Sequence, residues 1–206
     1  YMRRGELKEA PVFIEGMISE STAIHTAYPE YLSREVRNSI LNQEVNPFES
    51  DYFTVVEHPS AREDIIKGEP CIIVATAGML EGGPIIDYFQ QLAHDERNAI
   101  VFVSYQIEGT LGRRVQKGIP EVSIMNSERK IRALKLNLKV HTVEGFSGHS
   151  DRRQIIGFIR KVAPKHENVV VVHGEKSKCI ELADYLQRRH KINARAPDVL
   201  ETIMLR

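Results

Sequence analysis

The chain has 206 residues, of which 42% are hydrophobic and 7% aromatic, and its 28 Lys and Arg residues balance 28 Asp and Glu residues. This length fits one large domain or two small ones, and the composition is that of a folded protein rather than a disordered one. Two cysteines, Cys71 and Cys179, exclude a disulfide scaffold and a cysteine-rich zinc module. No apolar run approaches the roughly 20 residues of a membrane helix, so we expect a cytoplasmic protein without a membrane partner.

The two halves of the chain differ in charge. Residues 1–100 carry 8 basic and 17 acidic side chains, whereas residues 101–206 carry 20 basic and 11 acidic ones. This asymmetry indicates either a basic surface for a polyanion in the second half or simple attraction between the two halves. Charge alone leaves both interpretations open.

The first half of the chain predicts alternating strands and helices. Expected strands cover residues 11–18, 53–56, 70–76 and 99–104. A helical pattern over residues 22–42 breaks at Pro29 and leaves an expected helix over residues 29–42, and further helices are expected over residues 61–67 and 83–93. Pro29 is compatible with the first turn of its helix, whose buried face is predicted to hold Leu32, Val36 and Ile40. The continuous apolar runs at 70–76 and 99–104 are typical of strands buried on both faces of a parallel sheet.

The second half predicts a short basic helix over residues 110–117 and strands over residues 121–124 and 130–143. A further βαβ unit follows, with helices over residues 151–162 and 175–190 and a strand over residues 168–172. Ser150 is the expected N-cap of the first of these helices. The whole pattern predicts an α/β fold with a largely parallel sheet flanked by helices.

Two segments with polar or glycine residues follow predicted strands, where function gathers in parallel sheets. Gly78, Gly82 and Gly83 lie between a strand and a helix and predict either a phosphate-binding loop or a tight βα turn. In the next segment Tyr105 could stack on a base, and Arg113 and Arg114 could contact phosphates. The alternative for this segment is an ordinary solvated start of a helix.

Two histidines also lie at predicted strand ends. His149 is in a glycine-rich turn before a helix, where an imidazole could act as a general acid or base. His173 ends an apolar strand, where an imidazole could ligate a metal. Each could equally be a hydrogen-bonded structural residue, and two histidines alone do not make a catalytic zinc site.

The segments ATAGMLEGGP, SYQIEGTLGR, GFSGHSD and VVHGE occur in this order. Together they resemble the β-CASP family of metallo-β-lactamase-fold nucleases, and most closely its archaeal cleavage and polyadenylation specificity factor (CPSF)-like subfamily. The opening GMISESTAIHTAYPEYL and the ending APDVLETIMLR are similar to the same subfamily, so the resemblance covers nearly the whole chain.

The resemblance implies a zinc-dependent endoribonuclease that acts on single-stranded RNA in 3′-end processing or transcription termination. An additional 5′–3′ exonuclease activity is compatible with the resemblance. His149 matches a histidine that assists proton transfer, and His173 matches a ligand of one of two zinc ions. Ser147 and Gly148 belong to the same turn as His149. Residues 1–140 would form the β-CASP domain, and residues 141–206 would form the C-terminal segment of the metallo-β-lactamase domain. A homodimer through Val199–Leu205 is also implied.

The chain departs from the family pattern because the HxHxDH zinc motif and the remaining ligands do not occur in it. We therefore expect a C-terminal fragment that binds zinc incompletely or not at all and is inactive alone. A non-catalytic RNA-binding or assembly module is the main alternative. A weaker one is a small-molecule α/β enzyme that binds a phosphate at the GMLEGG turn.

Overall fold

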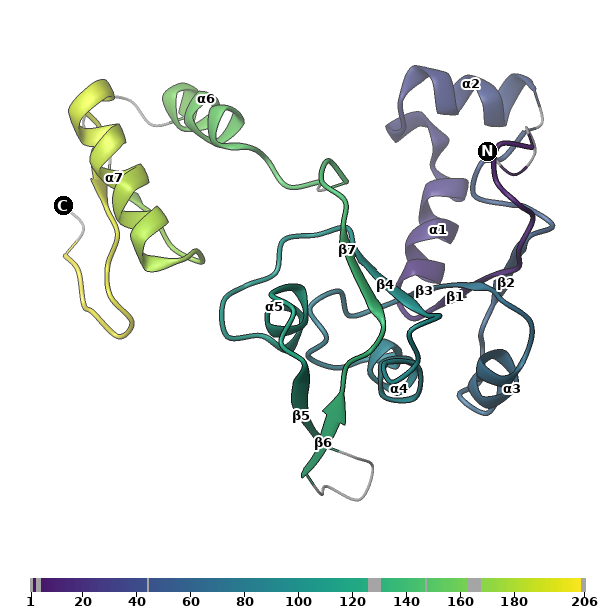
Figure 1. Cartoon of the computed structure of the whole chain (residues 1–206). Coiled ribbons are helices and arrows are strands. Elements are labelled where there is room, and N and C mark those ends of the chain that lie inside the picture. Colours follow the sequence, from purple (N-terminus) through teal and green to yellow (C-terminus); the bar gives the residue numbers. More distant parts are fainter. Residues whose placement is uncertain are drawn as a thin grey trace. The chain divides into compact units, whose positions relative to one another are not determined.

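The computed structural model describes residues 2, 5–43, 45–125, 131–146, 148–162 and 168–204. It divides the chain into two compact units, Tyr1–Ser147 (unit 1) and Gly148–Arg206 (unit 2). Figure 1 shows the elements of each. Among the described residues, no helix combines the length and the apolar character needed to cross a membrane.

Unit 1 begins with a three-stranded parallel sheet. Its strands are β1 (Val12–Glu15), β2 (Phe53–Val55) and β3 (Ile72–Ala75), in the order β2-β1-β3. Val12 lies opposite both Phe53 and Ile72 in the register. The parallel pairing confirms the α/β fold class.

The helices before β2 show the interruption expected near Pro29 but differ in their bounds from the helical pattern over residues 22–42. The structure has α1 (Ile18–Ala27), a 3-10 turn (Pro29–Tyr31) and α2 (Arg34–Asn42). Helix α2 begins only after Ser33, whose Oγ accepts a hydrogen bond from the Val36 amide at 3.3 Å. The residues of the expected buried face, Leu32, Val36 and Ile40, are each only partly buried.

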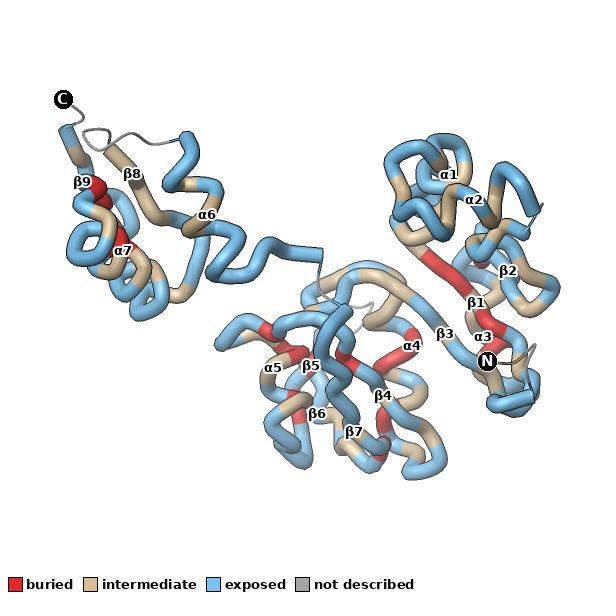
Figure 2. The backbone as a smooth tube through the Cα atoms, turned by 90° about the horizontal axis from the view of Figure 1, so that it is seen from above, coloured by how far each residue is buried: buried red, intermediate tan, exposed pale blue. Residues whose placement is uncertain are grey.

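One face of this sheet packs against helices α3 (Ala61–Lys67) and α4 (Pro84–Leu92). Val56, Ile65 and Tyr88 are buried there, with Phe13 and Ile73 beside them. Val55, Ile72 and Val74 on the opposite face remain exposed, as Figure 2 shows for β3. The expectation that β3 is buried on both faces is therefore not met within the described residues, because α3 and α4 lie on one face.

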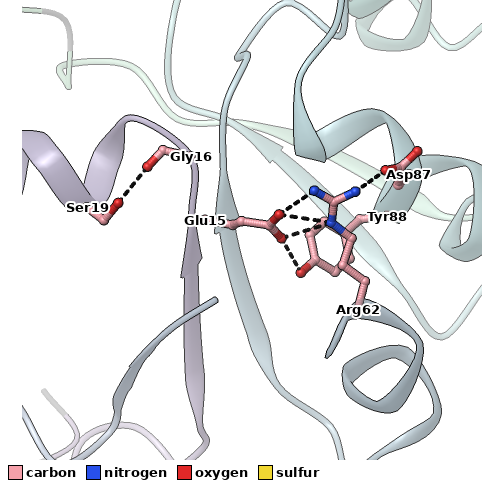
Figure 3. A network of polar contacts seen from close by, with 6 residues as sticks. All are labelled: Glu15, Gly16, Ser19, Arg62, Asp87 and Tyr88. Carbon is pink, nitrogen blue, oxygen red and sulfur yellow. Dashed lines mark hydrogen bonds and ion pairs between the residues drawn. The ribbon is translucent and has the colours of Figure 1, made fainter. Parts of the chain in front are cut away.

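A buried carboxylate ends β1. Glu15 accepts hydrogen bonds from Arg62 Nε at 2.9 Å and from the Tyr88 hydroxyl at 2.7 Å, and Arg62 also pairs with Asp87 (Figure 3). Buried charges need such partners, since an unpaired carboxylate would lose its hydration without replacement. The network ties β1 to α3 and α4.

The rest of unit 1 contains two strand pairs around helix α5 (Leu111–Gln116). Strands β4 (Ala99–Phe102) and β7 (Lys139–Thr142) are parallel. Strands β5 (Glu121–Met125) and β6 (Ile131–Lys135) are antiparallel. The core includes Leu80, Phe89, Phe102, Leu111, Val115 and Val122.

The single strand expected over residues 130–143 is divided into β6 and β7, and Lys130 itself lies outside the described residues. The amides of Asn137 and Leu138 both donate to the carbonyl of Ala93, at 2.8 and 3.1 Å. These bonds end the pairing of β6 with β5 and redirect the chain to pair with β4. Alternation of apolar residues predicted an extended segment but not this change of partner.

Unit 2 contains α6 (Arg152–Val162), β8 (Asn168–Val170), α7 (Lys176–His190) and β9 (Asn193–Arg195). Strands β8 and β9 are parallel. The core consists of Ala183, Leu186, Ile192 and Ala194. The N-cap of α6 is Asp151 rather than Ser150, because Asp151 Oδ1 accepts from the Gln154 amide and Gln154 Oε1 accepts from the Asp151 amide, each at 2.8 Å.

Candidate functional site

The glycine-rich segment between β3 and α4 forms a tight turn. A Cβ at Gly83, where φ is +73°, would lie 2.6 Å from the carbonyl oxygen of Thr76, and a Cβ at Gly78 would lie 3.2 Å from Ser104 Oγ. Gly82 has φ +153°, but a Cβ there would have no atom within 4 Å. Close packing therefore explains Gly83 and Gly78, while Gly82 has an open side toward which a ligand could approach.

The structure brings this turn together with the second predicted segment, residues 104–114. The Gly112 amide donates to the Met79 carbonyl at 2.9 Å, and the Leu111 amide donates to Glu81 Oε1 at 2.6 Å. A carboxylate at this position satisfies a free N–H at the start of α5. Glu81 thus supplies the negative charge at the start of α5. Nothing in the sequence indicated that Glu81 accepts a hydrogen bond from the Leu111 amide.

The two arginines of the second segment differ in their surroundings. Arg113 contacts Glu108 through Nε at 3.2 Å and donates from Nη1 to Gln116 at 2.7 Å. Glu108 also pairs with Lys117 at 2.6 Å, and these hydrogen bonds, first from Lys117 and then from Arg113, hold the pKa of Glu108 below its ordinary value. Arg114 is exposed and forms no side-chain ion pair within the described part of the chain. Arg114 is therefore better placed than Arg113 to contact an anion.

Tyr105 lies on the same segment, and half of its surface is exposed. Its chain neighbours Ser104 and Gln106 both contact the turn that holds Gly78. An exposed aromatic ring on this segment could stack on a nucleic-acid base.

The turn that carries His149 belongs to the start of unit 2. Gly148 and His149 are exposed and immediately precede the Asp151 cap of α6. A Cβ at Gly148 would have no atom within 4 Å. Ser147 lies outside the described residues, so its expected role remains a prediction.

His173 lies just beyond β8, and its side chain is exposed. Its backbone has φ +61°, in the left-handed region that costs a non-glycine residue about 1–2 kcal/mol. The following turn is tight, since a Cβ at Gly174 would lie 2.9 Å from Cys179 Sγ on α7. Backbone strain of this kind clusters at functional sites.

A zinc site needs several donor side chains that lie close together. Among residues 2–204, leaving aside the segments that the structure does not describe, no three His, Cys, Asp or Glu side chains form a group able to hold a metal ion. The exposed imidazole of His173 can supply one ligand, whereas a catalytic zinc takes about three protein ligands. The described residues therefore contain no complete set of ligands for a catalytic zinc ion.

Comparison with known proteins matches two families. A family described as "Beta-Casp domain" matches residues 1–115, and one described as "Zn-dependent metallo-hydrolase RNA specificity domain" matches residues 133–197. The chain is 51% identical over 207 positions to a protein of Pyrococcus abyssi named "Transcription termination factor FttA". Proteins of the same name from Methanococcus maripaludis and Cenarchaeum symbiosum are 52% identical over 198 positions and 50% identical over 206 positions.

The alignments cover 100%, 96% and 100% of this chain, respectively, but only 32%, 31% and 32% of those relatives. The chain thus spans about a third of the length of the curated relatives that it matches.

Proposed function

Because the chain belongs to the β-CASP family, we propose that it is part of a zinc-dependent endoribonuclease that cleaves single-stranded RNA in transcription termination or RNA 3′-end processing. The observation that carries this proposal is the similarity of the whole chain, at about 50% identity, to relatives named transcription termination factors. The match of residues 133–197 to an RNA specificity domain supports RNA as the substrate.

In this proposal the chain contributes parts of two domains to RNA binding and cleavage. Residues 1–140 form the β-CASP domain, and residues 141–206 form the C-terminal segment of the metallo-β-lactamase domain. The basic excess of residues 101–206, 20 basic against 11 acidic side chains, attracts the RNA backbone. The described loops contribute Gly78, Gly82, Gly83, Tyr105, Arg113, Arg114 and Gly148 to RNA contact, and Ser147 joins them.

His173 and His149 have different roles in cleavage. His173 holds one of two zinc ions through its exposed imidazole. When bound, zinc supplies a water of lowered pKa that serves as the nucleophile and a positive charge beside the phosphate. His149 donates a proton to the oxygen that leaves phosphorus, which a histidine can do near neutral pH.

The test uses the full-length protein with His173→Ala, His149→Ala and, as a matched control, the exposed His58→Ala in unit 1. His173→Ala should lower the zinc content and abolish RNA cleavage. His149→Ala should keep its zinc and slow cleavage by about 10²–10⁴-fold, the usual contribution of a general acid. Wild-type cleavage by both variants would refute the assigned roles.

A non-catalytic RNA-binding or assembly module is the second candidate. It is favoured by the incomplete metal-ligand set of the described residues. In this case the chain alone binds RNA with a steep salt dependence, and the full-length protein fails to cleave RNA when zinc is supplied. Cleavage that a chelator stops and added zinc restores would exclude this candidate.

We also propose a homodimer that forms through Val199–Leu205. Val199 and Leu200 are 93% and 99% exposed, which is unusual for apolar side chains, while Leu205 lies outside the described residues. Light scattering of this chain at micromolar concentration should give twice the monomer mass. A monomer mass would contradict the proposal for this chain.

A further inference from the structure

Gln106 is a deeply buried polar side chain in unit 1, with only 1% of its surface exposed. Its Nε2 group donates to the carbonyl of Gly78 at 3.0 Å and to the carbonyl of Ser104 at 3.2 Å. The first of these bonds joins residues 28 positions apart. One side-chain amide therefore connects the glycine-rich turn to the segment that carries Tyr105.

The other end of the same amide is not satisfied. Gln106 Oε1 is buried and has no hydrogen-bond partner within the described residues. A buried acceptor without a partner destabilises the folded state, because it has lost its bonds to water. A leucine or methionine at this position would avoid that cost but would lose both bonds that Nε2 donates, so what the amide provides is the connection between the two segments.

The neighbouring backbone is shaped around this amide. A Cβ at Gly112 would collide with Gln106 Oε1 and would lie 2.8 Å from the Met79 carbonyl oxygen. Only glycine lets the start of α5 approach both groups this closely. The bonds from the Leu111 and Gly112 amides to Glu81 and Met79 then complete the connection between the two segments.

We propose that Gln106 is a positioning residue, which holds residues 78–83 and 104–114 in one fixed arrangement and thereby sets the affinity for RNA. This inference rests on the proposed function, in which the exposed groups of these segments, Gly82, Tyr105 and Arg114, contact RNA. When such groups are already fixed in the free protein, less conformational entropy is lost as RNA binds. Gln106 itself does not touch RNA, because it is buried.

The test compares Gln106→Leu with wild type in the full-length protein. Asn98→Leu is the matched control, since its partly buried Nδ2 donates to the Leu92 carbonyl at 3.0 Å in the same unit but away from both segments. Hydrogen exchange measures the Leu111 and Gly112 amides, titration measures RNA affinity, and single-turnover kinetics measures cleavage at saturating RNA. Gly112→Ala, which displaces the amide, is a second variant in case Gln106→Leu misfolds.

In Gln106→Leu and Gly112→Ala, we expect exchange at Leu111 and Gly112 to accelerate at least tenfold and RNA to bind 5- to 20-fold more weakly. Cleavage at saturating RNA should stay within twofold of wild type. Unchanged exchange at Leu111 and Gly112 overturns the inference. Faster exchange with wild-type affinity for RNA also overturns it, as does an equal loss of RNA affinity in Asn98→Leu. If wild type itself binds no RNA, the proposed function fails, whereas the exchange data still decide whether Gln106 connects the segments.

Discussion

The hydroxyl of Tyr88 donates a 2.7 Å hydrogen bond to Glu15 Oε2, which joins α4 to the end of β1 across 73 residues of sequence. Tyr88 is 1% and Glu15 6% exposed. Burial by itself raises the pKa of Glu15, but hydrogen bonds from Arg62 and Tyr88 and the charge of Arg62 outweigh it and leave the pKa below its ordinary value. Burial, followed by the bond to Glu15, raises the pKa of Tyr88. The pair is thus a phenol that donates to a carboxylate at neutral pH.

Removal of this hydroxyl should destabilise unit 1. Tyr88→Phe keeps the ring in the core but leaves Glu15 Oε2 without one donor. Hydrogen bonds to charged groups contribute about 1.5–3 kcal/mol, so the free energy of unfolding in urea should fall by about that amount. The control is Tyr31→Phe at a highly exposed position, which should change it by less than about 0.5 kcal/mol. Equal stability of Tyr88→Phe and wild type would show that the bond contributes nothing.

The free energy of unfolding of unit 1 should depend on pH because Glu15 is protonated in acid. Its pKa is lower in the folded chain than the ordinary value of about 4.3, so the unfolded chain binds the proton more readily. The stabilisation is complete above that ordinary value and is lost as the pH falls through the lowered folded pKa. Urea unfolding between pH 2 and pH 6 should therefore show a weaker pH dependence in Glu15→Gln than in wild type. Parallel pH profiles of the two proteins would contradict the assignment to Glu15.

Gly83 and Gly157 should respond in opposite ways to alanine. Gly83 has φ +73° and would bring a Cβ against the Thr76 carbonyl, so Gly83→Ala should cost about 2 kcal/mol or more. Gly157 lies within α6 and has open space around a Cβ, so Gly157→Ala should stabilise unit 2 by up to about 1 kcal/mol. Thermal unfolding monitored by circular dichroism measures both. Destabilisation by Gly157→Ala would mean that its surroundings are tighter than described.

Neutralising Glu108 should strengthen RNA binding by the full-length protein. Glu108 pairs with both Arg113 and Lys117, and Glu108→Gln releases their charges for phosphate contact. We expect affinity to rise about two- to fivefold at low salt and the salt dependence to become steeper, as expected for additional phosphate contacts. Glu63→Gln, which frees Lys67 on α3, is the control with the same change in charge. An equal gain in RNA affinity in both variants would show that the effect is a general electrostatic attraction between the protein and RNA and not a contact of Arg113 or Lys117.

Most elements of the structure are of the kind that the sequence predicts, but some of their boundaries differ. The helix over residues 61–67 was predicted with its bounds, because Gly68 is a strong local stop signal. The helix start at Pro29 was wrong, because Ser33 supplies a cap four residues later. Apolar alternation over residues 130–143 could not reveal the carbonyl of Ala93, which divides the segment. His149 and His173 were singled out because they lie at the ends of predicted strands, and their roles remain predictions, whereas Gln106 and Glu81 carried no such sign.

Most of the strands and helices, the parallel α/β class and the family follow from the sequence alone, because they depend on short motifs and on the periodicity of neighbouring residues. The tertiary structure alone decided that Glu15 meets Arg62 and Tyr88, that Gln106 reaches Gly78, and that β6 and β7 pair with different strands. These contacts join residues far apart in the chain. They arise when packing brings buried polar groups within reach of one another, and each such group must then find a partner or lower the stability of the fold.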